Sequence, residues 1–206
     1  MTLNYFKSIL SFIFPPSENE DLIYQTTKED ILTLYEPRDG IHATTLLPYT
    51  DKRVRAAIHL VKFRNHTYAK KLLANVLAKH LQSLPAISEA VIIPIPLSKA
   101  RLRKRGYNQV QEVIQEALTA ISSTPSLCTK QLQRIRDTSP QTALSKNKRL
   151  QNVQGAFAVK DKKYKLQNKH IILIDDVITT GATLSEAKQA LKRAHPSSIT
   201  CIALAH

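Results

Sequence analysis

The sequence predicts an α/β protein whose sheet is mostly parallel, twisted and flanked by helices. From Ile41 onward, short apolar segments alternate with longer segments that carry apolar residues at helical spacing, which is typical of parallel strands joined by crossover helices. One short segment, residues 171–174, is aliphatic throughout, as expected for a central strand buried on both faces. At 206 residues and 43% apolar composition, the chain can bury a core without disulfides or metal ions.

The first forty residues differ from the rest of the chain in composition and in the spacing of their apolar residues. Apolar residues at helical spacing in residues 1–14 predict a short amphipathic helix that ends at Pro15 and Pro16. We expect this helix to pack on its own domain or on a partner, with binding to a membrane surface as the alternative. Residues 15–40 are acidic and weakly periodic, and they predict a linker or a small irregular subdomain. The chain is therefore divided into residues 1–40 and a main domain of residues 41–206.

The main domain is predicted to alternate strands with helices. Strands are expected at residues 42–49, 90–95, 127–133, 155–159, 171–174 and 198–204, and helices at residues 51–63, 68–81, 108–121 and 183–194. Asp51 and Asn108 are residue types that cap the first turn of a helix. Residues 134–154 fit neither pattern and predict a long loop, which in a compact domain is usually functional or mobile.

Composition restricts the partners and the compartment. Thirty Lys and Arg residues against sixteen Asp and Glu residues give a net charge of +14, which favours an anionic partner. A nucleic-acid backbone, a polyphosphate metabolite, an acidic protein and a merely solvated basic surface all satisfy this charge. Cys128 and Cys201 stand apart from any Cys or His cluster, so we expect buried free thiols, no zinc and a cytoplasmic location. No segment approaches about 20 uncharged apolar residues, so no membrane insertion is expected.

The most informative segment begins where residues 171–174 end. Asp175 and Asp176 come directly after this strand, so they are expected at the carboxyl edge of the sheet, where open α/β sheets bind ligands. Adjacent carboxylates are costly to bury without a cation or donors, and they suit sugar hydroxyls and a hydrated Mg²⁺. A turn of small residues follows before the next helix, and its amides and hydroxyls suit a phosphate group. The turn consists of Thr179, Thr180, Gly181, Ala182 and Thr183.

This segment resembles the signature with which phosphoribosyltransferases bind 5-phosphoribosyl 1-pyrophosphate (PRPP). The resemblance implies that Asp175 and Asp176 act in catalysis by holding the ribose 2′ and 3′ hydroxyls, and that they hold Mg²⁺ through the ribose or water. It also implies that residues 179–183 bind the 5′-phosphate.

Two further blocks narrow the resemblance. Two segments of the chain are similar to blocks of the ComF/GntX-type, competence-associated phosphoribosyltransferase-like proteins. The first segment comprises residues 93–98, the basic run that follows them, and residues 105–109. The second comprises residues 134–157. Leu60, Val61, Lys62 and Phe63 match the lysine-bearing helix of that family. The resemblance implies the type I phosphoribosyltransferase fold and a link to DNA uptake in natural competence. Relatives commonly open with a zinc ribbon, but no cysteine follows Pro16 in this chain until Cys128, so residues 1–40 are a degenerate counterpart without zinc.

Two basic segments are assigned to the substrate. We expect the run from 99 to 105 to neutralise a pyrophosphate together with Mg²⁺, with a nucleic-acid backbone or a solvated surface as alternatives. The run contains Lys99, Arg101, Arg103, Lys104 and Arg105. Residues 134–152 occupy the place of the mobile flap in type I phosphoribosyltransferases. Its candidate contacts are Arg134, Arg136, Gln141 and Arg149.

Two functional hypotheses follow. In the first, the protein binds PRPP and Mg²⁺ and transfers phosphoribose to a nitrogen nucleophile that the sequence does not identify, with release of pyrophosphate. In the second, it is a non-enzymatic protein of the competence machinery that senses PRPP or handles single-stranded DNA, with DNA or competence proteins as partners. Aromatic residues for base stacking are scarce, at 6% of the chain, which weighs against the second hypothesis.

Overall fold

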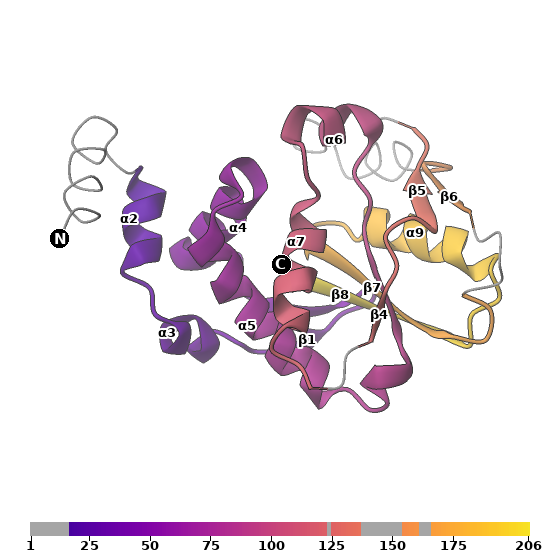
Figure 1. Cartoon of the computed structure of the whole chain (residues 1–206), viewed down its shortest axis with the longest axis horizontal. Helices are drawn as coiled ribbons and strands as arrows, with labels where there is room; N and C mark the ends of the chain where they lie inside the picture. The colour runs from indigo at the N-terminus through magenta and orange to yellow at the C-terminus, as the bar shows by residue number, and fades with distance from the viewer. Residues whose placement is uncertain (1–16, 123–124, 137–153, 161–165) are drawn as a thin grey trace.

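The computed structural model describes residues 17–122, 125–136, 154–160 and 166–206. Its main sheet has the strand order β1-β2-β8-β7-β3-β4 (Figure 1). Neighbouring strands in this sheet are parallel, except that β1 and β2 are antiparallel. The strands are β1 (Arg38–Asp39), β2 (Thr44–Leu47), β3 (Val91–Pro94), β4 (Ser126–Leu127), β7 (His170–Val177) and β8 (Ser198–Ala205). The predicted α/β class with a mostly parallel sheet is confirmed.

The central strand β7 is buried on both faces because its side chains alternate between two cores. Ile172 and Ile174 belong to one apolar cluster, and Ile171 and Leu173 belong to the other. The helices α4 (Lys52–Arg64), α5 (Thr67–Ser83) and α7 (Gln109–Leu118) supply the first cluster. The helix α9 (Ala182–Lys192) and a two-stranded ribbon of β5 (Leu132–Arg134) and β6 (Phe157–Val159) supply the second. Figure 1 shows these two layers on either side of the sheet.

The register of the sheet brings the acid pair to its carboxyl edge. Pro94, the last residue of β3, pairs with Ile174, so β7 continues beyond its neighbour on that side. Asp175 is therefore the first residue of β7 past the end of β3. The other neighbour, β8, accompanies β7 as far as the pair between Val177 and Ala205.

Residues 17–40 correct one prediction. They form two short helices, α2 (Glu18–Tyr24) and α3 (Lys28–Thr33), instead of an irregular linker. Each helix begins with a capping box, in which Ser17 pairs with Glu20 and Thr27 pairs with Asp30. One isoleucine from each helix is fully buried in the core of α4 and α5. Helices of 7 and 6 residues are too short to show clear periodicity. The helix predicted over residues 1–14 lies outside the described residues, and the boundary at residue 40 stays a prediction.

Two local predictions also differ from the structure, and two of its elements were not predicted. Residues 127–133 are not one strand, because β4 joins the main sheet and β5 joins the ribbon. The basic run forms a helix, α6 (Lys99–Arg105), and a 3₁₀ turn spans Ile87–Glu89. Cys201 is buried as expected, but Cys128 is half-buried; both are free thiols. Each helix in the described part of the chain is too short or too polar to cross a membrane.

Candidate functional site

Asp175 and Asp176 lie together at the end of β7 and are held by short hydrogen bonds. The Oδ1 atom of Asp175 accepts from the amide of Asp176 (2.9 Å), and the Oδ1 atom of Asp176 accepts from the amide of Val177 (2.8 Å). Burial and the neighbouring Asp176 raise the pKa of Asp175 to about 8, and Lys62 opposes this shift. Without a ligand, the pair therefore holds a proton at neutral pH.

Gln109 connects the acid pair to the basic helix. Its Nε2 atom donates to the Oδ2 atom of Asp176 (2.7 Å), and its Oε1 atom accepts a hydrogen bond from Nη1 of Arg105. Burial lowers the pKa of Arg105, and Asp176 opposes this shift. The amide of Gln109 thus lies between a carboxylate and a guanidinium group, and it orients both. Gln109 lies in the family-like block of residues 105–109, but the sequence pattern predicts no role for it at the site.

The residues before Gln109 explain why it is placed so firmly. Gly106 ends α6 with a left-handed φ of 82°, a conformation that glycine adopts without strain. Asn108 caps α7 by accepting from the amide of Val110 (3.0 Å), and it donates to the carbonyl of Ile95 (2.9 Å). Asn108 therefore fastens the start of α7 to the chain that leaves β3, and its predicted capping role is confirmed.

Tyr107 attaches the same segment to the end of α4. Its hydroxyl donates to the carbonyl of Val61 (2.8 Å) and accepts from the amide of Asn65 (2.9 Å). Asn65 ends α4 with a left-handed φ of 48°. One residue therefore fixes the last turn of α4 beside the acid pair, where Lys62 acts on Asp175.

The other cations of α6 are not all equivalent. Lys99, Arg103 and Lys104 are exposed, whereas Arg101 and Arg105 are half-buried. Since β3 and β7 are parallel neighbours, α6 begins at the same sheet edge at which the acids lie (Figure 1). The basic run therefore lies at this edge, and its contact with a pyrophosphate stays a prediction.

The turn between β7 and α9 needs glycine at one position. Gly181 has a φ of 72° and stands at the N-terminus of α9. A Cβ atom added there would lie 2.2 Å from Cδ2 of His42, so the imidazole packs directly on this glycine. Ala182 is buried and Thr183 is half-buried behind it. The turn feeds a helix N-terminus whose dipole favours an anion, as the sequence predicted.

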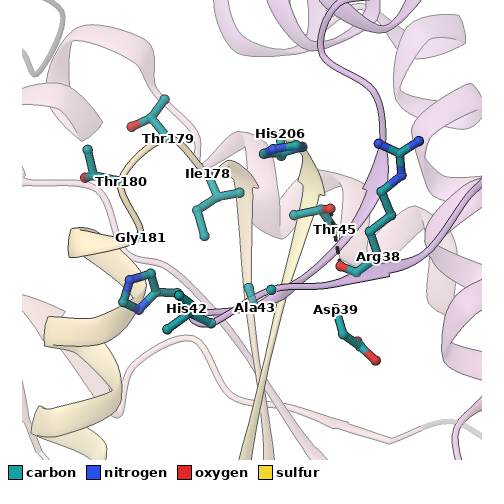
Figure 2. Close-up of a pocket in the computed structure, with 12 residues that line it drawn as sticks. Arg38, Asp39, His42, Ala43, Thr45, Ile178, Thr179, Thr180, Gly181 and His206 are labelled. Carbon is teal, nitrogen blue, oxygen red and sulfur yellow. Dashed lines mark hydrogen bonds between the residues drawn. The ribbon is translucent and has the colours of Figure 1, made fainter.

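A cavity of about 610 Å³ lies beside this turn (Figure 2). The turn between β1 and β2 forms one wall, and residues 178–181 and the C-terminal His206 form the other. Figure 2 shows Arg38, Asp39 and His42 on the hairpin side and Thr179 and Thr180 on the loop side. The hairpin was not predicted, because its first strand, β1, lies in the weakly periodic segment 15–40. The acid pair is not part of the lining.

The predicted flap residues have structural partners where they are described. The guanidinium carbon of Arg134 lies 5.4 Å from the centre of the Phe157 ring, across the β5–β6 ribbon. Nη1 of Arg136 donates to the carbonyl of Gln154 (3.0 Å). The amide of Gly155 donates to Glu186 of α9 (2.6 Å), which joins the ribbon to the helix after the phosphate turn. Gln141 and Arg149 lie outside the described residues, and contact of any of these residues with substrate stays a prediction.

The strand β7, with Asp175 and Asp176 near its end and a small-residue turn into α9, has the arrangement expected of a phosphoribosyltransferase-type domain. The family model described as "Phosphoribosyl transferase domain" matches residues 68–206. The chain is 34% identical over 142 residues to Competence protein F of Haemophilus influenzae, covering 66% of this chain and 60% of that protein. It is 36% identical over 116 residues to Competence protein ComFC of Bacillus subtilis, and the match covers 54% of this chain and 44% of that protein. The chain thus belongs to the phosphoribosyltransferase family, in its ComF-type group, and has the type I fold.

The matched region spans 60% of the length of the Haemophilus relative and less than half of the Bacillus one. Among solved structures, a phosphoribosyltransferase from Corynebacterium diphtheriae is similar with a TM-score of 0.40 and 14% identity, covering 91% of this chain and 80% of that one. The family assignment does not depend on this likeness.

Proposed function

We propose that this domain binds PRPP together with Mg²⁺ at the carboxyl edge of its sheet. The main support is that a half-buried acid pair near the end of β7 is followed in the chain by a glycine turn at the N-terminus of α9. Asp175 and Asp176 then accept hydrogen bonds from the ribose 2′ and 3′ hydroxyls. The backbone and hydroxyls of residues 179–183 hold the 5′-phosphate.

The donor set at the acid pair fits Mg²⁺. Both acids offer carboxylate oxygens, which are the ligands that this ion prefers, directly or through water. Burial and the neighbouring Asp176 raise the pKa of Asp175, and a cation bound at the pair would favour its ionised form. When bound, Mg²⁺ neutralises charge on the substrate's pyrophosphate.

The transfer itself requires positioning and charge rather than covalent chemistry by the protein. A nitrogen nucleophile attacks C1′ of the ribose, the bond from C1′ to the pyrophosphate oxygen breaks, and pyrophosphate leaves with the electron pair. The nitrogen then loses its proton. In this proposal, Arg105, held by Gln109, and the exposed cations of α6 stabilise the charge that develops on the leaving group. In this scheme the enzyme acts by holding two reactants in line.

Calorimetry with PRPP and Mg²⁺ tests the proposal. We expect the wild type to bind, and Asp175→Asn and Asp176→Asn each to weaken binding by about 10- to 150-fold, because each removes a charged hydrogen-bond acceptor. Asp21→Asn, a matched change on the exposed side of α2, should bind as the wild type does. Equal affinity in all four proteins would show that the acids do not hold the sugar.

A second candidate function is binding of single-stranded DNA, with PRPP as a regulatory ligand. It is supported by the exposed cations of α6 and by the name of a relative, the DNA utilization protein YhgH of Escherichia coli. A backbone contact of this kind predicts an affinity for an oligonucleotide that falls steeply with salt. Weak binding that does not change between low and high salt would remove this candidate.

A further inference from the structure

A second cavity, of about 320 Å³, lies where α2 ends and α5 begins. The described residues that line it are Tyr24, His66, Thr67, Tyr68 and Lys71. Neither acid of the candidate site is among them, and Figure 1 shows α2 on the far side of α4 from the sheet. A cavity of this size suits one small molecule. It is therefore a place for a ligand other than the one at the acid pair.

Three of the five lining residues carry aromatic rings. The rings of Tyr24 and Tyr68 are nearly parallel, with 15° between their planes and 6.3 Å between their centres. The imidazole of His66 meets the ring of Tyr24 edge-on, with 5.3 Å between the ring centres. Tyr24 is 63% exposed, so its ring keeps a free surface. A planar ring of a ligand can extend this aromatic stack.

Hydrogen bonds hold these rings in place. The hydroxyl of Tyr68 donates to the carbonyl of Thr26, just after α2 (2.9 Å). The Nδ1 atom of His66 accepts from the amide of Ala69 (3.2 Å) and so caps α5. Because this nitrogen is an acceptor, the Nε2 atom carries the proton and donates to the hydroxyl of Tyr24 (3.2 Å). The hydroxyl proton of Tyr24 is therefore available to a ligand.

The charge at the cavity favours an anion. Lys71 is exposed and gives the described lining a positive charge. The first turn of α5 contains no acidic residue, whereas α2 and α3 both begin with acids. The amides of Thr67 and Tyr68 stand in the first turn of this 17-residue helix, where amides have no intrahelical acceptor. These amides and the ammonium group of Lys71 together suit a phosphate group.

The surroundings of the cavity favour a small anion over a nucleic-acid strand. Glu18, Asp21 and Glu29 are exposed on α2 and α3. Asp21 precedes Tyr24 by three residues, so the two lie on the same face of α2. A long phosphate backbone that left the cavity along α2 would meet these acids, and like charges disfavour such a contact. The occupant is therefore expected to be a single charged molecule.

We propose that this cavity binds one nucleoside 5′-monophosphate, at a site separate from the acid pair. The base stacks on the ring of Tyr24, and the phosphate contacts Lys71 and the first amides of α5. The inference goes beyond the proposed function, since none of these residues takes part in it.

Adenosine 5′-monophosphate (AMP), adenosine and ribose 5-phosphate are the probes for this proposal. Calorimetry is done on the double variant Asp175→Asn/Asp176→Asn, which lacks the carboxylates of the proposed PRPP site. AMP should bind about 5- to 150-fold more tightly than ribose 5-phosphate, the range expected of one stacked base. AMP should also bind at least about 2-fold more tightly than adenosine, because adenosine lacks the phosphate that Lys71 contacts.

Further substitutions in the same double variant identify the cavity. Tyr24→Ala should weaken AMP binding by about 5- to 150-fold, whereas Tyr24→Phe keeps the ring and should retain most of the affinity. Lys71→Ala should weaken AMP binding by about 2- to 5-fold, the effect of one exposed ion pair. The controls are Tyr49→Ala and Lys52→Ala, which remove an exposed ring and an exposed cation elsewhere and should have no effect.

Four results would overturn this inference. They are no binding of AMP, equal affinities for AMP and adenosine, an unchanged affinity in Tyr24→Ala, and an equal loss in the control variants. If a single-stranded oligothymidylate binds more tightly than AMP and Tyr24→Ala weakens both, the cavity belongs to a strand-binding surface instead. Each of these results leaves the proposed function standing, because PRPP binding is measured on the wild type and depends on other residues.

Discussion

Replacing Asp175 with asparagine should make the stability of the unliganded protein less dependent on pH. Burial and Asp176 raise the pKa of Asp175 to about 8 in the folded protein, whereas 3.8 is its ordinary value. Between these two values, the folded protein holds a proton that the unfolded chain has released. The free energy of unfolding therefore contains a contribution that is fully present below the lower pKa and is lost as the pH rises through the higher one.

The uptake of a single proton limits how steeply the free energy of unfolding can change with pH. One proton changes the free energy of unfolding by at most about 1.4 kcal/mol per pH unit. Urea denaturation of wild type and Asp175→Asn between about pH 5 and pH 8 measures the two slopes, with Asp21→Asn as the control. His80, whose pKa burial lowers, contributes equally to all three proteins and cancels in the comparison. If wild type and Asp175→Asn have the same slope, the folded protein does not hold this proton and the reasoning is wrong.

Two further substitutions test how the site is built. Gly181→Ala should destabilise the protein by at least about 1 kcal/mol more than Gly106→Ala in urea denaturation, since both positions have a left-handed φ but only the Cβ at Gly181 meets His42. PRPP affinity should fall only in Gly181→Ala, and equal losses in the two variants would contradict this account. Gln109→Leu removes the side-chain donor to Asp176 and should cost about 1–3 kcal/mol of stability. Unchanged stability in Gln109→Leu would show that the hydrogen bond from Gln109 to Asp176 does not stabilise the folded protein.

The sequence predicts correctly those features in which the role of a residue in the fold depends on its own segment of the chain. Residues 171–174 are aliphatic because β7 is central and buried on both faces, so their pattern predicts their place. The acids directly follow these four residues within β7, and the glycine turn comes after the strand, so these parts of the candidate site lie in one continuous segment. Asn108 caps its own helix, which is also a local property.

The missed features depend on contacts between distant segments. Gln109 has the spacing of an ordinary polar helix residue, and only the fold brings it to Asp176, 67 residues away. The role of His42 could not be predicted because the two-residue strand β1 has no periodicity of its own and the contact with Gly181 crosses the domain. The helix α6 buries no residue, so it lacks the apolar stripe by which helices are predicted.

A crystal structure of the protein with PRPP and Mg²⁺ tests the central claim most directly. We expect the ribose 2′ and 3′ hydroxyls within hydrogen-bond distance of Asp175 and Asp176, and the 5′-phosphate against the backbone of residues 179–183. Density for the sugar phosphate elsewhere, whether along α6 or in the cavity between His42 and His206, would contradict the account.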